Sequence, residues 1–248
     1  ATTDDPYSPL ENHGDLGGVK VRPTFRADAR FKEGVKKTEL EKRLDYFVEK
    51  GCKIADYGID FVSENDENLI WLIENCYKRK MLLQLHFGTF RNVNAKMYER
   101  CGKDSGFDIM RGAIDTDKLA KILDRENARL GGLPKIVVYP LNDYDLRALG
   151  ALTGAFPQVK LGAAWWFNDT VNGIKRQLET AAEYSALGTQ YGMLTDSRSF
   201  SSYVRFDFYR RILSSFIGER VENGEYDESA AIALARKIAY ENIKAALM

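Results

Sequence analysis

The sequence has few histidines and cysteines, and neither sign of charge is in excess. It contains two histidines, three cysteines (Cys52, Cys76 and Cys101), and equal numbers of basic and acidic residues, 36 of each. The balanced charge argues against a nucleic-acid partner or an acidic membrane surface, because no basic excess exists to neutralise phosphates. Three cysteines are an odd number with no CxxC spacing. They predict reduced, mostly buried thiols in a cytoplasmic protein.

Long apolar runs are also missing. No stretch approaches the ~20 apolar residues of a membrane-spanning helix, and the first thirty residues show no signal-peptide pattern. We therefore expect no membrane partner. With 44% hydrophobic and 29% charged residues, the composition is that of a globular protein. The length suits one barrel-sized domain of ~250 residues, so we predict a single domain over residues 1–248.

Several catalytic motifs are absent. Neither GxGxxG nor GxxxxGK[ST] follows the first predicted strand, which argues against a nucleotide-binding doubly wound sheet. The chain has no GxSxG and no HExxH, and His86 has no evident cysteine partner. These absences disfavour nucleophilic hydrolysis and a zinc site completed within the chain.

Short apolar segments alternate with amphipathic helical patterns along the chain. The predicted strands are 19–25, 52–59, 82–87, 135–141, 160–166 and 191–195. The predicted helices are 38–50, 65–79, 116–130, 143–154, 170–187, 204–222 and 227–247, the first with a capping-box pattern at Thr38 and Glu41. This alternation predicts an α/β fold with a parallel sheet. We interpret it as part of a (β/α)8 TIM-type barrel, whose reactive face lies at the C-terminal ends of the strands.

Polar and aromatic side chains collect where the predicted strands end. They are Arg26, Asp56, His86, Arg91, Trp165, Trp166, Asn168, Asp169, Asp196, Ser197 and Arg198. In a barrel they would converge on one mouth, suited to a small polar anion. His86 is the hardest to explain structurally, because histidine is easily poised near neutral pH. His13 lies in a glycine-rich loop, where we expect it to be solvated.

Each of the other residues also has a structural interpretation. Asp196 could cap a turn, and Asp169 could cap the helix that begins near Thr170. Arg91 and Arg198 could form weak ion pairs on the rim. Asp56 could pair with Lys20 or Arg22, and the two tryptophans could belong to the core.

Six motifs, in order along the chain, resemble those of the uronate (glucuronate) isomerase family. They are TTDDP (2–6), RPTFRAD (22–28), ADYGID (55–60), LQLHFGTFRN (83–92), GAAWWFNDT (162–170) and GMLTDSRSFSSYVRFDFYRRIL (192–213). The resemblance implies an amidohydrolase-superfamily barrel. It also implies isomerisation of D-glucuronate to D-fructuronate and of D-galacturonate to D-tagaturonate.

The resemblance also implies roles for particular residues. Asp196 matches a carboxylate that ligates a divalent metal, expected to be zinc, and moves protons. Arg198 matches an arginine beside it that contacts substrate, and His86 is a candidate for proton transfer. The positions expected to line the substrate site are Arg26, Asp56, Arg91, Trp165 and Trp166. Isomerisation needs a base near C2 of the sugar and a cation for the developing oxyanion, and these residue types can provide both.

The chain departs from the family in several ways. Family members are roughly twice as long, and their first strand carries an HxH metal-ligand pair that is absent here, as is a substrate-contacting tyrosine of their N-terminal half. Tyr57 stands where many members have histidine. We expect the chain to begin near the end of the second barrel strand, which leaves six of eight strands. Asp196 alone would hold a metal weakly, because zinc needs three or four protein ligands.

Three interpretations of this difference stay open: the C-terminal part of a longer enzyme, one chain of a split enzyme, or a shortened relative. The expected partners are a uronate and either further copies of the chain or the missing N-terminal half. The main functional alternative is a non-catalytic fragment or pseudoenzyme that retains an anion-binding mouth. Hydrolysis by metal-bound water is disfavoured more strongly, because it needs the absent histidine ligands.

Overall fold

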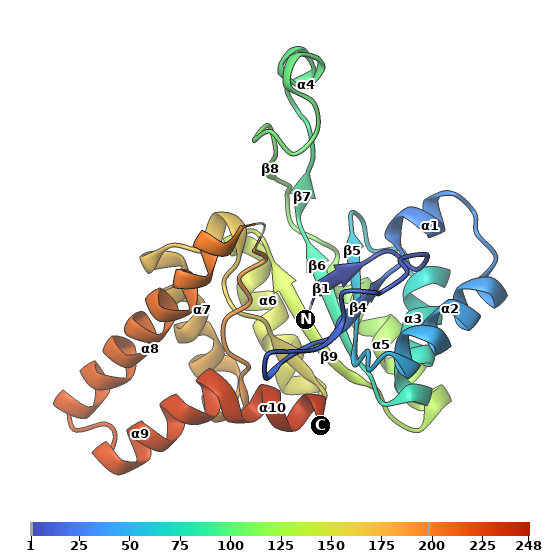
Figure 1. Ribbon diagram of the computed structural model, residues 1–248. Coiled ribbons are helices and arrows are strands. Elements are labelled where there is room, and N and C mark those ends of the chain that lie inside the picture. The colour runs from blue at the N-terminus through green and yellow to red at the C-terminus, as the bar shows by residue number, and fades with distance from the viewer. Residues whose placement is uncertain (1, 198) are drawn as a thin grey trace. The chain divides into compact units, whose positions relative to one another are not determined.

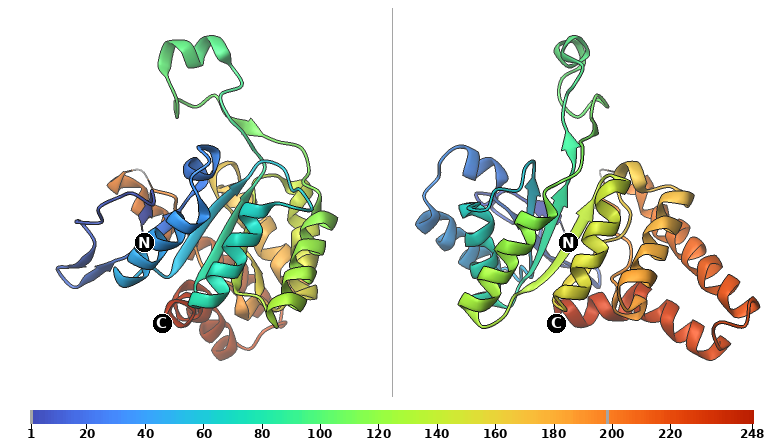
Figure 2. Two further views of the ribbon diagram at one scale, coloured as in Figure 1. Left: turned by 90° about the vertical axis from the view of Figure 1, so that its right-hand side faces the viewer. Right: turned by 180° about the vertical axis from the view of Figure 1, so that it is seen from behind.

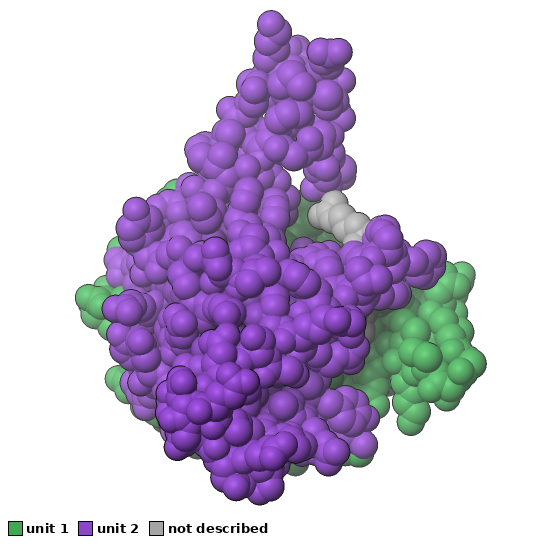
Figure 3. Space-filling model, turned by 90° about the vertical axis from the view of Figure 1, so that its left-hand side faces the viewer, with its two compact units in different colours: residues 1–86, 117–137, 246–248 green, residues 87–116, 138–245 purple. Residues whose placement is uncertain are grey.

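The computed structural model describes residues 2–197 and 199–248 and divides into two compact units that interleave along the chain. Unit 1 comprises residues 1–86, 117–137 and 246–248, and unit 2 comprises residues 87–116 and 138–245 (Figure 3). The two units are described separately below. A single domain over the whole chain stays a prediction.

The main sheet has six strands in the order β1-β4-β5-β6-β9-β10 (Figure 1). Their bounds are Thr2–Asp4, Pro23–Arg26, Ile54–Ile59, Leu82–Phe87, Lys135–Pro140 and Val159–Leu161. The pairs β1–β4 and β4–β5 are parallel, and Arg26 is in register with Asp56. Residues in register on neighbouring strands lie side by side, so these two charged groups are neighbours.

In unit 1, helices cover the sheet strands, and a small hairpin lies between β1 and β4 in the sequence (Figure 2). The helices are α1 (Asp28–Lys32), α2 (Lys37–Glu49), α3 (Glu67–Arg79) and α5 (Thr116–Leu130), and the hairpin joins β2 (Gly14–Leu16) to β3 (Val19–Val21). The rings of Phe25 on β4 and Phe47 on α2 meet edge to face, 5.2 Å apart. Both rings are fully buried, so this contact fixes α2 against the strand whose last residue is Arg26.

Unit 2 contains a projecting arm and a group of helices. The arm consists of β7 (Thr89–Phe90), α4 (Ala95–Cys101) and β8 (Ile109–Met110), and it extends away from the rest of unit 2 (Figures 1 and 2). The α-helices are α6 (Asp143–Ala155), α7 (Val171–Tyr184), α8 (Arg205–Glu222), α9 (Glu228–Arg236) and α10 (Asn242–Leu247). The short helical turns are η1 (Trp166–Asn168), η2 (Leu187–Thr189), η3 (Phe200–Val204) and the π-helical η4 (Lys237–Glu241).

Most predicted elements are confirmed, and two share their bounds with the structure: the strand 82–87 and the helix 116–130. The predicted strand 191–195 is wrong, because this segment has no strand structure. A Cβ added to Gly192 would lie 2.8 Å from the carbonyl oxygen of Ile238. The apolar run is therefore packed against the helical turn η4 rather than paired in a sheet.

Three smaller expectations are also corrected. Thr38 does not cap α2, whose N-cap is Lys36, with no side-chain hydrogen bond. The predicted helix 227–247 is divided by the π-helical turn η4, and the predicted strand 160–166 ends at Leu161. Within residues 2–197 and 199–248, no helix has the length and apolar character needed to span a bilayer.

Candidate active site

Three of the predicted site residues, on the neighbouring strands β4, β5 and β6, meet in unit 1. Asp56 is the shared partner: one carboxylate oxygen lies 3.2 Å from Nη1 of Arg26, and the other lies 3.1 Å from Nδ1 of His86. The Asp56 side chain is 4% exposed, that of His86 13% and that of Arg26 39%. The carboxylate is thus buried between two nitrogen groups, and the guanidinium is the most accessible member.

This arrangement gives each group a distinct chemical property. An ionised carboxylate only accepts hydrogen bonds, so its proximity to Nδ1 favours a proton on that nitrogen. Nε2 is then the ring nitrogen whose protonation can change, as general acid–base catalysis requires. A planar guanidinium can bind a second carboxylate bidentately. The suggested pairing of Asp56 with Lys20 or Arg22 is wrong, because its ion pairs are with Arg26 and His86.

A second carboxylate, which the sequence did not single out, also contacts Arg26. Oδ2 of Asp28 accepts a hydrogen bond from Nε of Arg26 at 2.9 Å and one from the backbone N–H of Gly58 at 3.4 Å. Burial raises the pKa of Asp28, and Arg26 opposes that rise. Asp28 belongs to the quoted motif RPTFRAD, but its spacing alone did not indicate that its side chain would turn back toward Arg26.

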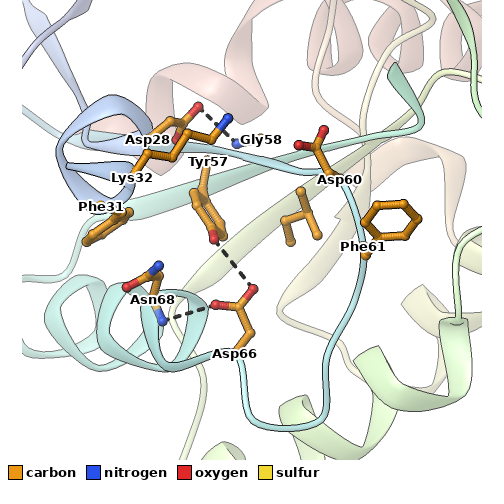
Figure 4. Close-up of a pocket in the computed structure, with 10 residues that line it drawn as sticks. Asp28, Phe31, Lys32, Tyr57, Gly58, Asp60, Phe61, Asp66 and Asn68 are labelled. Atoms are coloured by element: carbon orange, nitrogen blue, oxygen red, sulfur yellow. Dashed lines mark hydrogen bonds between the residues drawn. The ribbon is translucent and has the colours of Figure 1, made fainter. Parts of the chain in front are cut away.

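A cavity of about 340 Å³ in unit 1 is lined partly by Asp28. Its aromatic members are Phe31, Tyr57 and Phe61, and its polar members include Asp66, Asn68 and Lys32 (Figure 4). The hydroxyl of Tyr57 donates to Asp66, which also accepts from the backbone N–H of Asn68 as the N-cap of α3. Burial raises the pKa of Tyr57, so this phenol stays protonated at neutral pH.

In unit 2, the residues around the tryptophan pair form an aromatic and cationic group. Trp165 is buried, at 6% exposure, and its ring centroid lies 5.6 Å from that of Trp166. The guanidinium of Arg91 lies over Trp166, 4.7 Å from the ring centroid. It also pairs with Asp108 at 2.9 Å. The expected ion pair of Arg91 is therefore present, together with a cation–π contact that holds the side chain.

Asp196 lies on an exposed loop segment of unit 2 that is anchored just before it. Its φ of 46° is in the left-handed region, which is uncommon for a residue other than glycine. The preceding Thr195 is buried, and its carbonyl oxygen accepts from Arg205 at 2.9 Å. Arg205 also forms an ion pair with the buried Asp169. This contact fixes the entry to the Asp196 loop.

Two structural interpretations of the sequence are corrected here. Asp169 does not cap α7, whose N-cap is Thr170, with its hydroxyl accepting from the N–H of Gly173. His13 is not solvated: its side chain is 9% exposed and lies 3.2 Å from Asp4 and 2.6 Å from the hydroxyl of Thr2. Arg198 lies outside the described residues, so its predicted role stays a prediction.

A metal site cannot be assembled from the described part of the chain. No cluster of three or more His, Cys, Asp or Glu side chains occurs among residues 2–197 and 199–248. Structural and catalytic zinc sites need at least three such ligands. The donor set present here therefore does not fit a metal by itself, and no chemical step is assigned to one below.

The chain is similar to isomerases of sugar acids. The family model described as glucuronate isomerase matches residues 65–246. Two curated relatives are the uronate isomerases of Serratia proteamaculans, 32% identical, and Caldanaerobacter subterraneus, 33% identical. The alignments cover 98% of this chain but only 65% and 66% of these relatives. The first alignment extends over 308 residues, so that relative has internal segments with no counterpart in the 248 residues here.

Solved structures have the same fold. The uronate isomerase of Thermotoga maritima superposes with a TM-score of 0.91 at 27% identity, covering 100% of this chain and 67% of its own. The glucuronate isomerase of Caulobacter crescentus has a TM-score of 0.86 at 24% identity, covering 99% and 63%. At 24% identity the second match supports the fold alone. Together they confirm the predicted α/β, TIM-type fold class.

Proposed function

Because this chain belongs to the glucuronate isomerase family, we propose that it takes part in the aldose–ketose isomerisation of D-glucuronate and D-galacturonate. The products are D-fructuronate and D-tagaturonate. The observation that carries the proposal is the pairing of Asp56 with both Arg26 and His86, 3.2 and 3.1 Å away. It combines an anion-binding group on β4 with a proton-transfer group on β6, through a carboxylate on β5 between them.

Arg26 is proposed to bind the carboxylate that distinguishes a uronate from a neutral sugar. Its side chain is 39% exposed, which leaves it accessible to a ligand. Its ion pairs with Asp28 and Asp56 hold it at two nitrogens. Arg91 and the neighbouring tryptophans are proposed as further substrate-binding groups, since an aromatic face suits the apolar face of a sugar. The guanidinium of Arg91 is 46% exposed.

His86 and Asp196 are proposed to move protons. The isomerisation takes a proton from C2 of the aldose and delivers one to C1 through an enediolate. Asp56 orients the imidazole of His86 through Nδ1, and Nε2 is proposed to exchange the proton. Asp196 is exposed on an anchored loop, which supports a role at substrate as a base. Arg198 is proposed to stabilise the oxyanion beside it.

A divalent metal, expected to be zinc, is proposed for Asp196 on the family resemblance alone. A bound divalent ion would stabilise negative charge on a substrate oxygen. The remaining ligands are not found in the described residues, so the roles proposed above are carried by side chains of this chain.

A second candidate is a non-catalytic sugar-acid-binding protein. It is favoured by the absence of an HxH pair from this sequence, since that pair supplies two metal ligands in the resembled family. Binding without turnover would support it over the isomerase.

The deciding experiment is an isomerase assay with D-glucuronate and D-galacturonate, with and without added zinc or manganese. Asp196→Asn serves as the control variant. Turnover that is lost in the control supports the isomerase. A folded protein that binds either uronate without converting it, under all metal conditions, overturns the catalytic proposal for this chain.

A further inference from the structure

Arg26 is held at two of its nitrogens by two different carboxylates. Nε donates to Oδ2 of Asp28 at 2.9 Å, and Nη1 lies 3.2 Å from Oδ2 of Asp56. A single contact would let the guanidinium turn about that point, whereas two contacts on separate nitrogens define the plane of the group. Asp56 also pairs with His86, whereas the second contact of Asp28 is with the backbone N–H of Gly58.

Asp28 does not cap its own helix. It is the first residue of α1, but the N-cap is Ala27 and the helix has no side-chain cap hydrogen bond. Its Oδ2 instead contacts Arg26 and the backbone of β5 at Gly58. Its Oδ1 is buried and has no hydrogen-bond partner in the described part of the chain. A buried carboxylate oxygen without a partner costs free energy, which argues against a purely stabilising role.

We propose that Asp28 is a positioning residue that fixes the plane of the Arg26 guanidinium, so that Arg26 receives the carboxylate of a uronate in one orientation. The inference rests on the proposed function for its substrate. The contact between Asp28 and Gly58 ties this orientation to the end of β5, the strand that carries Asp56. Preorganisation of this kind lowers the entropy that a flexible arginine loses on binding.

The test compares Asp28→Asn with the matched control Asp60→Asn. Asp60 is exposed and lines the same cavity, so both variants lose one carboxylate from the same region. In Asp28→Asn the KM for D-glucuronate should rise roughly tenfold while kcat stays within about threefold, because the lost interaction concerns substrate binding. Asp60→Asn should match the wild type. A KM that is equal in the two variants overturns the inference.

A second readout does not depend on turnover. The ¹⁵N signal of the Arg26 Nε–H, assigned by its loss in Arg26→Lys, reports the hydrogen bond to Asp28. In Asp28→Asn, this proton should exchange with water roughly tenfold faster, and Asp28→Glu should restore part of the protection. Unchanged exchange overturns the positioning role, even if activity is lost.

The two readouts also separate the two proposals. If the wild type neither binds nor converts D-glucuronate, the proposed function fails, and the exchange measurement still decides whether Asp28 fixes Arg26. If Asp28→Asn does not fold by circular dichroism, Asp28→Glu replaces it in both assays. A folded Asp28→Glu with wild-type KM and wild-type exchange supports the role of the carboxylate. A folded Asp28→Glu in which the Arg26 proton exchanges faster while KM stays at the wild-type value overturns it.

Discussion

Replacing Asp56 with asparagine tests the central contact of the candidate site. Asparagine keeps the shape of the side chain and an acceptor oxygen but removes the charge between Arg26 and His86. A polar contact to a charged group contributes about 1 kcal/mol more than one to a neutral group, so each ion pair should weaken by about 1 kcal/mol. Because the Arg26 side chain is 39% exposed, water screens its ion pair with Asp56 and reduces the contribution of that pair to stability. We expect the free energy of unfolding to fall by about 1–2 kcal/mol.

The effect of Asp56→Asn on catalysis should exceed its effect on stability. The substitution releases the proposed substrate-binding guanidinium and the proposed proton-transfer imidazole together. We expect kcat/KM for D-glucuronate to fall by about 100-fold, equivalent to ~2.7 kcal/mol of transition-state stabilisation. Urea unfolding measures the free energy of unfolding, and initial rates of ketose formation measure kcat/KM.

A surface ion pair provides the control for this experiment. Asp45 contacts Arg79 at 2.6 Å, but its side chain is 57% exposed. Exposed pairs contribute ~0–1 kcal/mol, so Asp45→Asn should leave kcat/KM unchanged and alter stability by less than about 1 kcal/mol. If Asp56→Asn retained kcat/KM within about threefold of the wild type, the role of this carboxylate would be refuted.

Three further predictions follow from buried groups. Burial raises the folded-state pKa of Asp28, so folding carries a cost for its ionised form. Asp28→Asn should therefore be as stable as the wild type or more so at pH 7. That difference should shrink as pH falls through the folded pKa, which urea unfolding across pH would show. Asp169→Asn should lower the free energy of unfolding by about 1–3 kcal/mol and reduce kcat, because it removes the ion pair that anchors the Asp196 loop; loss of neither would contradict that anchor. A thiol reagent should label the exposed Cys101 rapidly, but the buried Cys52, whose pKa is raised to about 11, and Cys76 only after unfolding.

Local patterns in the sequence were enough to predict the helices and strands that bury one face in the core. The helix 116–130 and the strand 82–87 have clear periodicity, and both have the predicted bounds. β1 was missed because its residues Thr2–Asp4 are polar and half-buried or exposed. It becomes a strand only by pairing with β4. The strand predicted at 191–195 was wrong for the opposite reason. A loop that packs on a helix is also apolar, and periodicity does not distinguish such a loop from a buried strand.

The candidate site was predicted in part. Sequence motifs predicted Arg26, Asp56 and His86 as site residues, but they did not predict that Asp56 contacts the other two. Asp28 and Arg205 were missed because their importance lies in contacts with groups that a single sequence does not reveal: the turn back to Arg26, and the carbonyl of Thr195. Side-chain direction after a strand end depends on backbone geometry that residue type does not specify.

The interleaving of the two units has a consequence for folding kinetics. Unit 1 draws on three separated stretches of the chain, and Arg22 donates to the carbonyl oxygen of Leu247, 225 positions away, at 3.1 Å. Contacts at such sequence separation raise the contact order, which slows folding. Neighbouring helices and turns can form early, whereas unit 1 is complete only when residues 246–248 reach the first strands. We therefore expect refolding to be slow, with late formation of the contacts between the first strands and residues 246–248.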